Sequence, residues 1–327
     1  MQAGKVPPDL LQRLVYPYLG RRAGVLVHAH LGEDCAVLDF GEWVCVVTCD
    51  PITAAVRHLG RLAVHVTCND LATTGAEPIG ILLTLLLKEH TRPEDLEVIM
   101  RDAGQAAADL GVEIVGGHTE VTPGIDRTIA AVTALGRARR TEVVSAGGAR
   151  SKDVVLLTKG AGIEGTAILA SDLADRLRSL VGEALLSRAQ RFIERISVIP
   201  EGMAAARAGA TAMHDVTEGG VLAGAWELAE AAGLGIELWG DEVPVLPETA
   251  TICNALGVDP LGLIGSGAML IAAATPERIL EALAAKDIPA ATIGVMTQHE
   301  RVVIRASGRT ALVPPTRDEL WRVLEDA

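Results

Sequence analysis

The stretch from Leu59 to Pro78 places a carboxylate where an apolar surface is expected. Its apolar residues recur at about 100° per residue, as in an amphipathic helix, and Asn69 and Asp70 fall within the same arc. A carboxylate that faces inward loses its hydration, which is unfavourable unless a bound cation or backbone N–H donors compensate it. The pattern leaves two interpretations of Asp70 open, a hydrogen-bonded structural residue or a cation ligand.

Three further acids lie at the expected ends of neighbouring strands. Glu33 and Asp34 come just before the strand-like residues 35–38, and Asp50-Pro51 is expected to end the β-rich run Trp43–Cys49. Turn chemistry accounts for each acid singly, because Asp favours strand ends. It does not account for three acids gathered in this way, which favours a shared site.

Two glycine-rich segments are candidates for binding anions. Gly116-Gly117-His118-Thr119 follows the predicted strand 112–115, and paired glycines let the backbone approach a phosphate. Residues 159–165 contain G-x-G-x-x-G after the predicted strand 153–158. The second strand and its acid, which a dinucleotide site needs about twenty residues later, are replaced by helical sequence. We interpret this loop as an anion site at a helix N-terminus.

The segment Ala212–Gly220 crowds His214, Asp215, Thr217 and Glu218 ahead of a predicted helix. A helix cap would explain one of these residues. Four polar residues within five positions, after an apolar lead-in, indicate a site.

Composition limits the partners. The chain has 327 residues, a net charge of −13 and 22% charged residues, and it is 49% hydrophobic but only 2% aromatic, so we expect two soluble domains with aliphatic cores. The negative charge argues against nucleic acid and membrane as partners, but not against nucleotides, because a divalent metal inverts the local charge. The five cysteines form no Cys-x-x-Cys pair, which argues against a zinc site. The N-terminal sequence lacks a basic segment followed by an apolar run, so we predict no secretory signal and a cytoplasmic location.

The predicted elements alternate between helix and strand through both halves of the chain. A small, polar segment at 147–152 predicts a boundary between domains 1–147 and 148–327. Thr91 is predicted to cap a helix 93–110 that ends at Gly111, and the last helix, 317–325, is predicted to be polar and peripheral. Other helices are predicted at 9–19, 59–74, 171–195, 201–208, 220–232, 248–256 and 276–285, and other strands at 79–87, 127–137, 235–238, 268–273, 291–295 and 301–305.

Taken in order, these motifs resemble the PurM-like superfamily of aminoimidazole ribonucleotide (AIR) synthetase, thiamine-monophosphate kinase, selenophosphate synthetase and HypE, the hydrogenase maturation dehydratase. The second half looks closest to HypE. The matching stretches, which cover nearly the whole chain, are Gly32–Val37, Thr48–Asp50, Asn69–Ala72 with Gly75–Pro78, Gly116–Thr119, Gly160–Gly165, His214–Gly220 and Gly265–Gly267.

The resemblance implies a mixed α/β (α+β) fold of two domains. The first would bind ATP and Mg²⁺ and pair with its copy in a homodimer. The matching acids imply that Asp34, Asp50 and Asp70 hold the metals, with Glu33 in the place of another acid. Asn69 and the N–H groups of Gly116 and Gly117 would contact phosphate oxygens, together with Thr119.

By the same analogy two loops of the second half face the terminal phosphate or the second substrate. The residues implied are Lys159, Gly160, Gly162 and Gly165 in the first loop, and Asp215, Thr217, Gly219 and Gly220 in the second. The catalytic residues implied are Asp70 together with His118, His214 and Glu218 as proton-transfer or orienting groups.

Two departures from the family pattern bear on function. His118 stands where most members carry an acid. The sequence ends Leu324-Glu325-Asp326-Ala327, whereas HypE proteins end in Pro-Arg-Ile-Cys with a cysteine that carries the reacting group. We therefore expect an acceptor carried by a small molecule or another protein.

The leading hypothesis is an ATP- and Mg²⁺-dependent enzyme that phosphorylates an amide- or carbonyl-type oxygen. The alternative is a non-catalytic nucleotide-binding or assembly protein on the same fold. A nicotinamide oxidoreductase is a weaker third interpretation, based only on the G-x-G-x-x-G loop.

Overall fold

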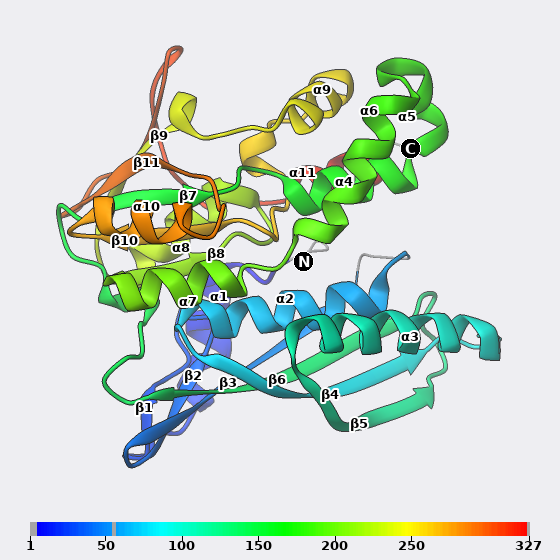
Figure 1. Cartoon of the computed structure of the whole chain (residues 1–327), viewed down its shortest axis with the longest axis horizontal. Helices are drawn as coiled ribbons and strands as arrows, with labels where there is room; N and C mark the ends of the chain where they lie inside the picture. Colours follow the sequence, from blue (N-terminus) through cyan, green and yellow to red (C-terminus); the bar gives the residue numbers. More distant parts are fainter. Residues whose placement is uncertain (1–4, 54–56, 326–327) are drawn as a thin grey trace.

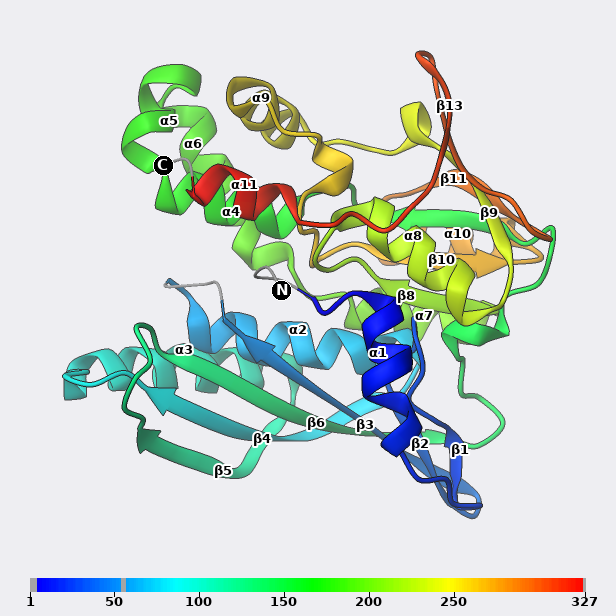
Figure 2. The same ribbon diagram turned by 180° about the vertical axis from the view of Figure 1, so that it is seen from behind.

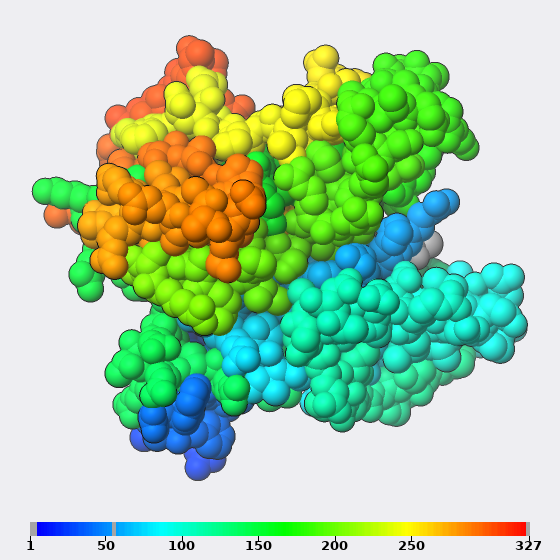
Figure 3. Space-filling view, in the orientation of Figure 1, coloured from blue at the N-terminus to red at the C-terminus, as the bar shows by residue number. Residues whose placement is uncertain are grey.

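Two β-sheets, each flanked by helices, form the two halves of the molecule, which pack closely together (Figures 1 and 3). This computed structural model describes residues 5–53 and 57–325. The predicted two-domain mixed α/β fold is confirmed. The first sheet ends at Arg139 and the second begins at Val154, so the proposed domain boundary at 147/148 falls between them. Met1–Gly4 and Asp326-Ala327, on which the predictions about the two chain ends partly rest, lie outside the described residues.

The first sheet has the order β1-β2-β3-β6-β4-β5, and only its β4–β5 pair is parallel. β3 pairs with β6 as far as Ile52, so the prediction that Asp50-Pro51 ends this strand is wrong. The strand instead carries Asp50 along the sheet. The bounds are β1 Val25–Val27, β2 Ala36–Phe40, β3 Trp43–Ile52, β4 Glu77–Leu87, β5 Glu113–Val121 and β6 Ile129–Arg139.

Helices α2 (Leu59–Thr73) and α3 (Pro93–Leu110) cover one face of this sheet (Figure 1). Every residue of α2 except Arg61 is buried, so the prediction that this helix is amphipathic is wrong. The physical reason is its position, because α2 also packs against α7 and β8 of the second domain. A helix enclosed on all sides needs no polar stripe.

The bounds of α3 agree with the prediction, but its cap does not. The Thr91 hydroxyl donates to the carbonyl of Lys88, and Arg92 occupies the N-cap position without a side-chain cap. Gly111, at φ 67°, ends the helix as predicted.

The second sheet has the order β13-β12-β9-β11-β7-β10-β8, and only β12–β9 is parallel. The edge hairpin strand β13 was not predicted. The bounds are β7 Val154–Thr158, β8 Ala212–Asp215, β9 Gly235–Trp239, β10 Met269–Ala273, β11 Ala290–Thr297, β12 Arg301–Arg305 and β13 Gly308–Ala311.

Helices α7, α8 and α10 pack against the second sheet, and α1 lies near the chain start (Figure 2). The others gather to one side of this sheet around a core of their own (Figure 1). The last helix, α11, was predicted to be peripheral, and this is wrong: Leu320 and Val323 are buried in a core shared with α4. The bounds are α1 Pro8–Leu14, α4 Ile163–Asp172, α5 Ala174–Val181, α6 Glu183–Gln190, α7 Ile199–Ala208, α8 Gly220–Ala231, α9 Pro247–Leu256, α10 Pro276–Ala284 and α11 Glu319–Glu325. Among the described residues, we find no helix with the length and apolar character needed to cross a lipid bilayer.

Candidate active site

A cleft of about 1380 Å³ is lined by residues of both domains. Its lining contains ten acidic residues but only two cationic ones, Lys5 and Arg127. Such a lining excludes a bare polyphosphate and favours cations. The acids are Glu33, Asp34, Asp50, Asp70, Asp126, Glu164, Asp172, Asp215, Glu218 and Asp318.

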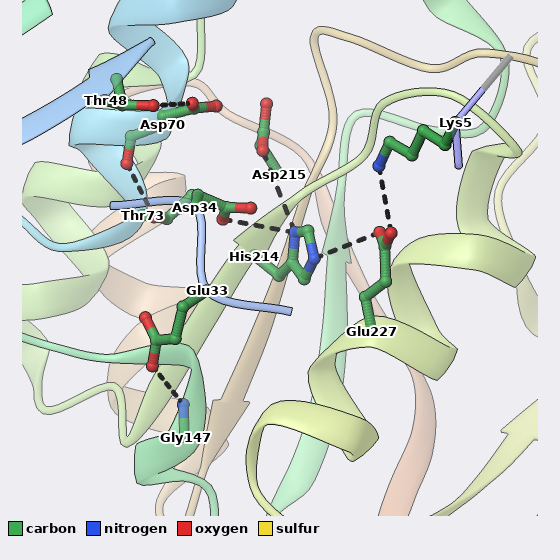
Figure 4. A network of polar contacts seen from close by, with 10 residues as sticks. All are labelled: Lys5, Glu33, Asp34, Thr48, Asp70, Thr73, Gly147, His214, Asp215 and Glu227. Atoms are coloured by element: carbon green, nitrogen blue, oxygen red, sulfur yellow. Dashed lines mark hydrogen bonds and ion pairs between the residues drawn. The ribbon is translucent and has the colours of Figure 1, made fainter. Parts of the chain in front are cut away.

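Four of these acids, Asp34, Asp50, Asp70 and Asp215, interact with one another and form a group that we call the acid cluster. Figure 4 shows three of them, Asp34, Asp70 and Asp215. They come from the loop before β2, from β3, from α2 and from the end of β8. The structure thus brings together the three acids implied as metal ligands. It adds Asp215, which the resemblance had assigned to phosphate or substrate.

Burial and mutual repulsion shape the electrostatics of the cluster. Burial, together with the charges of Asp50, Asp215 and Asp34, raises the pKa of Asp70 well above its ordinary value. Burial and the charge of Asp34 likewise raise the pKa of Asp215 well above its ordinary value. Burial raises the pKa of Asp34 to about 6. Several like charges held close together in a dry site are unfavourable without a counter-ion.

The donor set of the cluster fits a hard divalent cation. Both carboxylate oxygens of Asp215, and Oδ2 of Asp34, are buried without a hydrogen-bond partner among the described residues. One ligand atom each from Asp34, His214 and Asp215 lie within 4.8 Å of one another. Carboxylate oxygens are the ligands that Mg²⁺ prefers. At Asp70, Oδ2 already accepts a 2.5 Å hydrogen bond from the Thr48 hydroxyl, which orients the carboxylate.

His214 lies beside the acid cluster, with a carboxylate close to each of its ring nitrogens. Its Nδ1 is 3.4 Å from Oδ2 of Asp34, and its Nε2 is 3.3 Å from Oε2 of Glu227 (Figure 4). Burial alone lowers its pKa, but Asp34 and Glu227 outweigh this effect and raise the pKa to about 10. With carboxylates at both ring nitrogens, the imidazolium orients Asp34.

The partners of His214 could not be found from the sequence pattern. Lys5 donates to Oε1 of Glu227 over 3.0 Å. Burial raises the pKa of Glu227, but Lys5 and His214 overcome it and lower the pKa to about 2. A row of alternating charges therefore runs from Lys5 through Glu227 and His214 to Asp34.

Glu33 lines the cleft but is held by the protein itself. Its Oε1 accepts a 2.9 Å hydrogen bond from the N–H of Gly147 and another from the Ser145 hydroxyl. Because these donors satisfy that oxygen, Glu33 is better placed to anchor the interdomain segment than to bind a metal.

Asn69 does not face a phosphate. Its amide nitrogen donates to the carbonyl of Ile196 (2.7 Å), and its Oδ1 accepts from the N–H of Val198 (2.9 Å). Both ends of the amide are thus used to join α2 to the second domain, which corrects the role implied by the resemblance.

Gly116, Gly117, His118 and Thr119 lie on β5, outside the lining of the cleft. They pair with β4, and a Cβ on Gly117 would lie 1.8 Å from the carbonyl oxygen of Leu83. This glycine is required for strand pairing within the chain. Nε2 of His118 is 3.0 Å from Oε2 of Glu120, on an exposed edge. Within one chain, the structure does not bring these four residues to the acid cluster.

The G-x-G-x-x-G loop is a packing element and not an anion cradle. Residues 160–165 are buried, and the N–H groups of Ala161 and Gly165 donate to backbone carbonyls. Gly160 and Gly162 are likewise packed against the backbone or side chains of 244–263. β7 also pairs antiparallel with both neighbours, so the loop lies outside the parallel β-α-β unit of a dinucleotide-binding fold.

Lys159, implied as a phosphate contact, is used inside the second domain. Its ammonium lies 2.7 Å from Oε1 of Glu201 and donates to the carbonyls of Ser197 and Arg195. With these partners it stabilises the segment between α6 and α7.

The segment after β8, residues 216–220, was implied to face the terminal phosphate or the second substrate, and only part of it lines the cleft. Thr217 and Glu218 line the cleft. The N–H of Gly219 donates to Oδ2 of Asp318, and Gly220 packs against the carbonyls of residues 261 and 263. Neither Asp215 nor Thr217 caps α8 through its side chain, so the simple capping explanation of this segment is wrong.

Sequence reasoning missed a second polar group in the same cleft. Glu164 lies in the first turn of α4, Ser266 lies in the turn before β10, and Asp318 and Trp321 come from the C-terminal segment. The Trp321 indole donates to Oε1 of Glu218 (3.2 Å). Glu164 and Ser266 lie within the glycine-rich stretches 160–165 and 265–267, which were the available signals.

Two α/β domains that share one acid-lined cleft define the PurM-like class of proteins, and comparisons with known proteins agree. The AIR synthase related protein N-terminal domain model matches residues 32–138, and the corresponding C-terminal domain model matches residues 150–307. The chain belongs to the AIR synthase related family. The resemblance to this family is therefore confirmed, as is the prediction that the chain is an enzyme of the family.

Similar proteins point to the HypE branch. A Methanocaldococcus jannaschii protein named "Putative hydrogenase expression/formation protein" is 31% identical, over 98% of this chain and 97% of its own length. The carbamoyl dehydratase HypE of Escherichia coli is 30% identical over 77% of this chain and 74% of its own length. A crystal structure of hydrogenase maturation protein HypE in complex with ATP has a TM-score of 0.69 at 21% identity, and it covers 97% of each chain.

Proposed function

We propose that this protein binds ATP together with Mg²⁺ in the cleft and transfers the γ-phosphoryl group to an amide- or carbonyl-type oxygen. The observation that carries the proposal is the acid cluster, in which Asp34, Asp50, Asp70 and Asp215 converge from separate segments. Buried oxygens of two of them, Asp34 and Asp215, have no hydrogen-bond partner among the described residues. An acidic cleft can accept a triphosphate only when cations invert its charge.

The chain's own residues would act mainly by positioning. The four aspartates would hold the metal, which neutralises charge on the transferring phosphoryl group. Thr48 fixes Asp70, while Glu227 and Lys5 fix His214 against Asp34. These contacts hold the groups in position before a ligand binds, which favours catalysis.

The nature of the acceptor is supported by the relatives. The Escherichia coli relative is named a carbamoyl dehydratase, and a carbamoyl group offers an amide oxygen that phosphorylation converts into a leaving group. We propose an acceptor of this class, carried on a small molecule or on another protein.

We also propose that the protein is a cytoplasmic homodimer formed through the uncovered face and edge of the first sheet. Leu82 on β4 is 40% exposed, and Val115 and Val121 on β5 are 52% and 59% exposed. Exposed apolar side chains on an open strand edge are typical of an interface. Gly116, Gly117, His118 and Thr119 would reach a nucleotide only across such an interface.

Calorimetric titration with Mg-ATP, followed by product analysis with carbamoyl and amide acceptors, tests the proposal. We expect binding that requires Mg²⁺ and release of ADP, AMP or phosphate that an acceptor stimulates. Absence of Mg-ATP binding would overturn the proposal. Tight binding without turnover across the acceptor panel would instead support the non-catalytic nucleotide-binding alternative.

A further inference from the structure

Two unpartnered oxygens mark a separate polar site in the cleft. Glu164 is 5% exposed and Ser266 is 1% exposed, yet both line the cleft. Neither Oε2 of Glu164 nor Oγ of Ser266 has a hydrogen-bond partner among the described residues. Ser266 nevertheless lies close enough to Glu164 for hydrogen bonding from its side chain and backbone to lower the pKa of that carboxyl. Buried polar atoms without partners are rare, and here they point to a missing ligand.

The backbone around this pair is rigid. Gly165 follows Glu164, and a Cβ added there would lie 2.4 Å from Cγ of Leu263, so α4 starts in close contact with the segment that leads to Ser266. The N–H of Gly165 also donates to the carbonyl of Ile264. The pair is therefore held in place before any ligand binds, which favours specific recognition.

The neighbouring acids are already hydrogen-bonded. Glu218 accepts from the Trp321 indole, and Asp318 accepts from the N–H groups of Gly219 and Leu320. Burial, with the charges of Asp318 and Glu218, raises the pKa of Glu164 to about 7, although Ser266 opposes the shift. These neighbours repel an anionic ligand, whereas Oε2 of Glu164 and Oγ of Ser266 still lack a hydrogen-bond partner among the described residues.

We propose that Glu164 and Ser266 form the subsite that holds an uncharged primary amide or carbamoyl group of the acceptor. A primary amide has two N–H hydrogens and one carbonyl oxygen. Oε2 of Glu164 and Oγ of Ser266 supply two acceptors, and the Ser266 hydroxyl supplies one donor, so the numbers match. The inference rests on the proposed function, because it places the acceptor of that reaction.

Ligand-observed NMR on the full chain tests the inference with three small probes of similar size. They are acetamide (uncharged), acetate (anionic) and methylammonium (cationic). We expect acetamide to bind at least about tenfold more tightly than the two charged probes. Losing one hydrogen-bonding partner typically weakens binding by about tenfold, so Glu164→Leu and Ser266→Ala should each weaken acetamide binding to that extent.

Glu164→Gln is the decisive variant, because glutamine is isosteric with the uncharged acid and keeps an oxygen acceptor. It should retain acetamide binding, whereas a site for cations would lose its ligand. Asp172→Asn, which removes another acid of the same cleft, is the matched control and should leave acetamide binding unchanged. If Glu164→Leu does not fold, Ser266→Ala carries the test.

Acetamide binding that is unchanged in both Glu164→Leu and Ser266→Ala would overturn the subsite, as would preferred binding of methylammonium that Glu164→Gln abolishes. Mg-ATP titration of the wild type distinguishes a failure of the subsite from a failure of the proposed function. If Mg-ATP binds and acetamide does not, the subsite fails alone. If Mg-ATP does not bind, the proposed function fails, whatever the amide result.

Discussion

The side-chain amide of Asn69 on α2 joins the first domain to Ile196 of the second, donating to its carbonyl oxygen over 2.7 Å. The same amide accepts from Val198 through Oδ1, and the residue is fully buried. Its neighbour Asp70 lies in the acid cluster. Two consecutive residues of α2 therefore have different roles: Asn69 joins the two domains, and Asp70 lines the cleft.

Removing this amide should destabilise the protein strongly. Asn69→Ala leaves a buried carbonyl and a buried N–H without partners, each of which costs about 1–3 kcal/mol. We expect the free energy of unfolding to fall by roughly 2–4 kcal/mol, measured by urea denaturation. Gln105→Ala, which removes an exposed hydrogen bond to Asp109, should change stability little. Equal effects of the two substitutions would show that the Asn69 contact is not structural.

Asp70→Asn should raise stability and remove the response to Mg²⁺. In the absence of metal, the substitution relieves the repulsion among buried carboxylates, so the melting temperature should rise by a few degrees, at roughly 2 °C per kcal/mol. Wild type should gain stability when Mg²⁺ is added, and the variant should not. Glu89→Gln, an exposed acid, should behave as wild type. An equal Mg²⁺ response in wild type and Asp70→Asn would contradict a metal site at Asp70.

His65 should make stability depend on pH. It is 4% exposed, both ring nitrogens lack partners among the described residues, and burial, with the charge of Arg61, lowers its pKa to about 4. The unfolded chain takes up a proton below about pH 6.5, and the folded chain only near pH 4. Stability is therefore lost as the pH falls through this window, by about 3 kcal/mol in total.

Comparison with His65→Gln isolates this contribution from that of the buried acids. Its free energy of unfolding, measured by urea denaturation between pH 7 and 4, should fall by less than that of wild type. His299→Gln, at an exposed position, should keep the wild-type slope. A parallel pH dependence for His65→Gln and wild type would rule out the contribution of His65.

A charge on the open face of the first sheet should prevent dimer formation. Leu82→Arg places a cation where an apolar side chain is 40% exposed, and its burial in an interface would be unfavourable. We expect light scattering to give a dimer mass for wild type and a monomer mass for the variant. Phe40→Arg changes a residue that is 71% exposed at another strand end and should leave the dimer intact. A monomeric wild type would contradict the proposed homodimer.

The sequence predicts features that depend on neighbouring residues. The buried position of Asp70 was predicted correctly, although the whole helix around it is buried and not only one arc, and the bounds of α3 follow from Pro93 and Gly111. The order of motifs was sufficient to predict the two-domain fold. Each of these features is encoded within a short stretch of chain or in the order of stretches.

The sequence does not predict contacts between distant segments. Asn69 is paired with residues 127 and 129 positions away, and His214 is clamped by Glu227 and Lys5. The sequence around Gly117 is typical of a phosphate-binding loop, but in the fold this glycine packs against the carbonyl oxygen of Leu83 on β4. In each case tertiary packing used a polar or flexible residue to which the resemblance or the local pattern had given a role toward substrate or phosphate.

The central claim is that Asp34, Asp50, Asp70 and Asp215 bind divalent metal together with ATP. Crystals grown with Mn²⁺ in place of Mg²⁺ and a non-hydrolysable ATP analogue test it directly, because anomalous scattering locates the metal. We predict at least one Mn²⁺ peak within about 2.5 Å of oxygens from two or more of these aspartates, with the triphosphate bound to the metal. A nucleotide bound without metal at these aspartates, or metal bound only elsewhere, would contradict the claim.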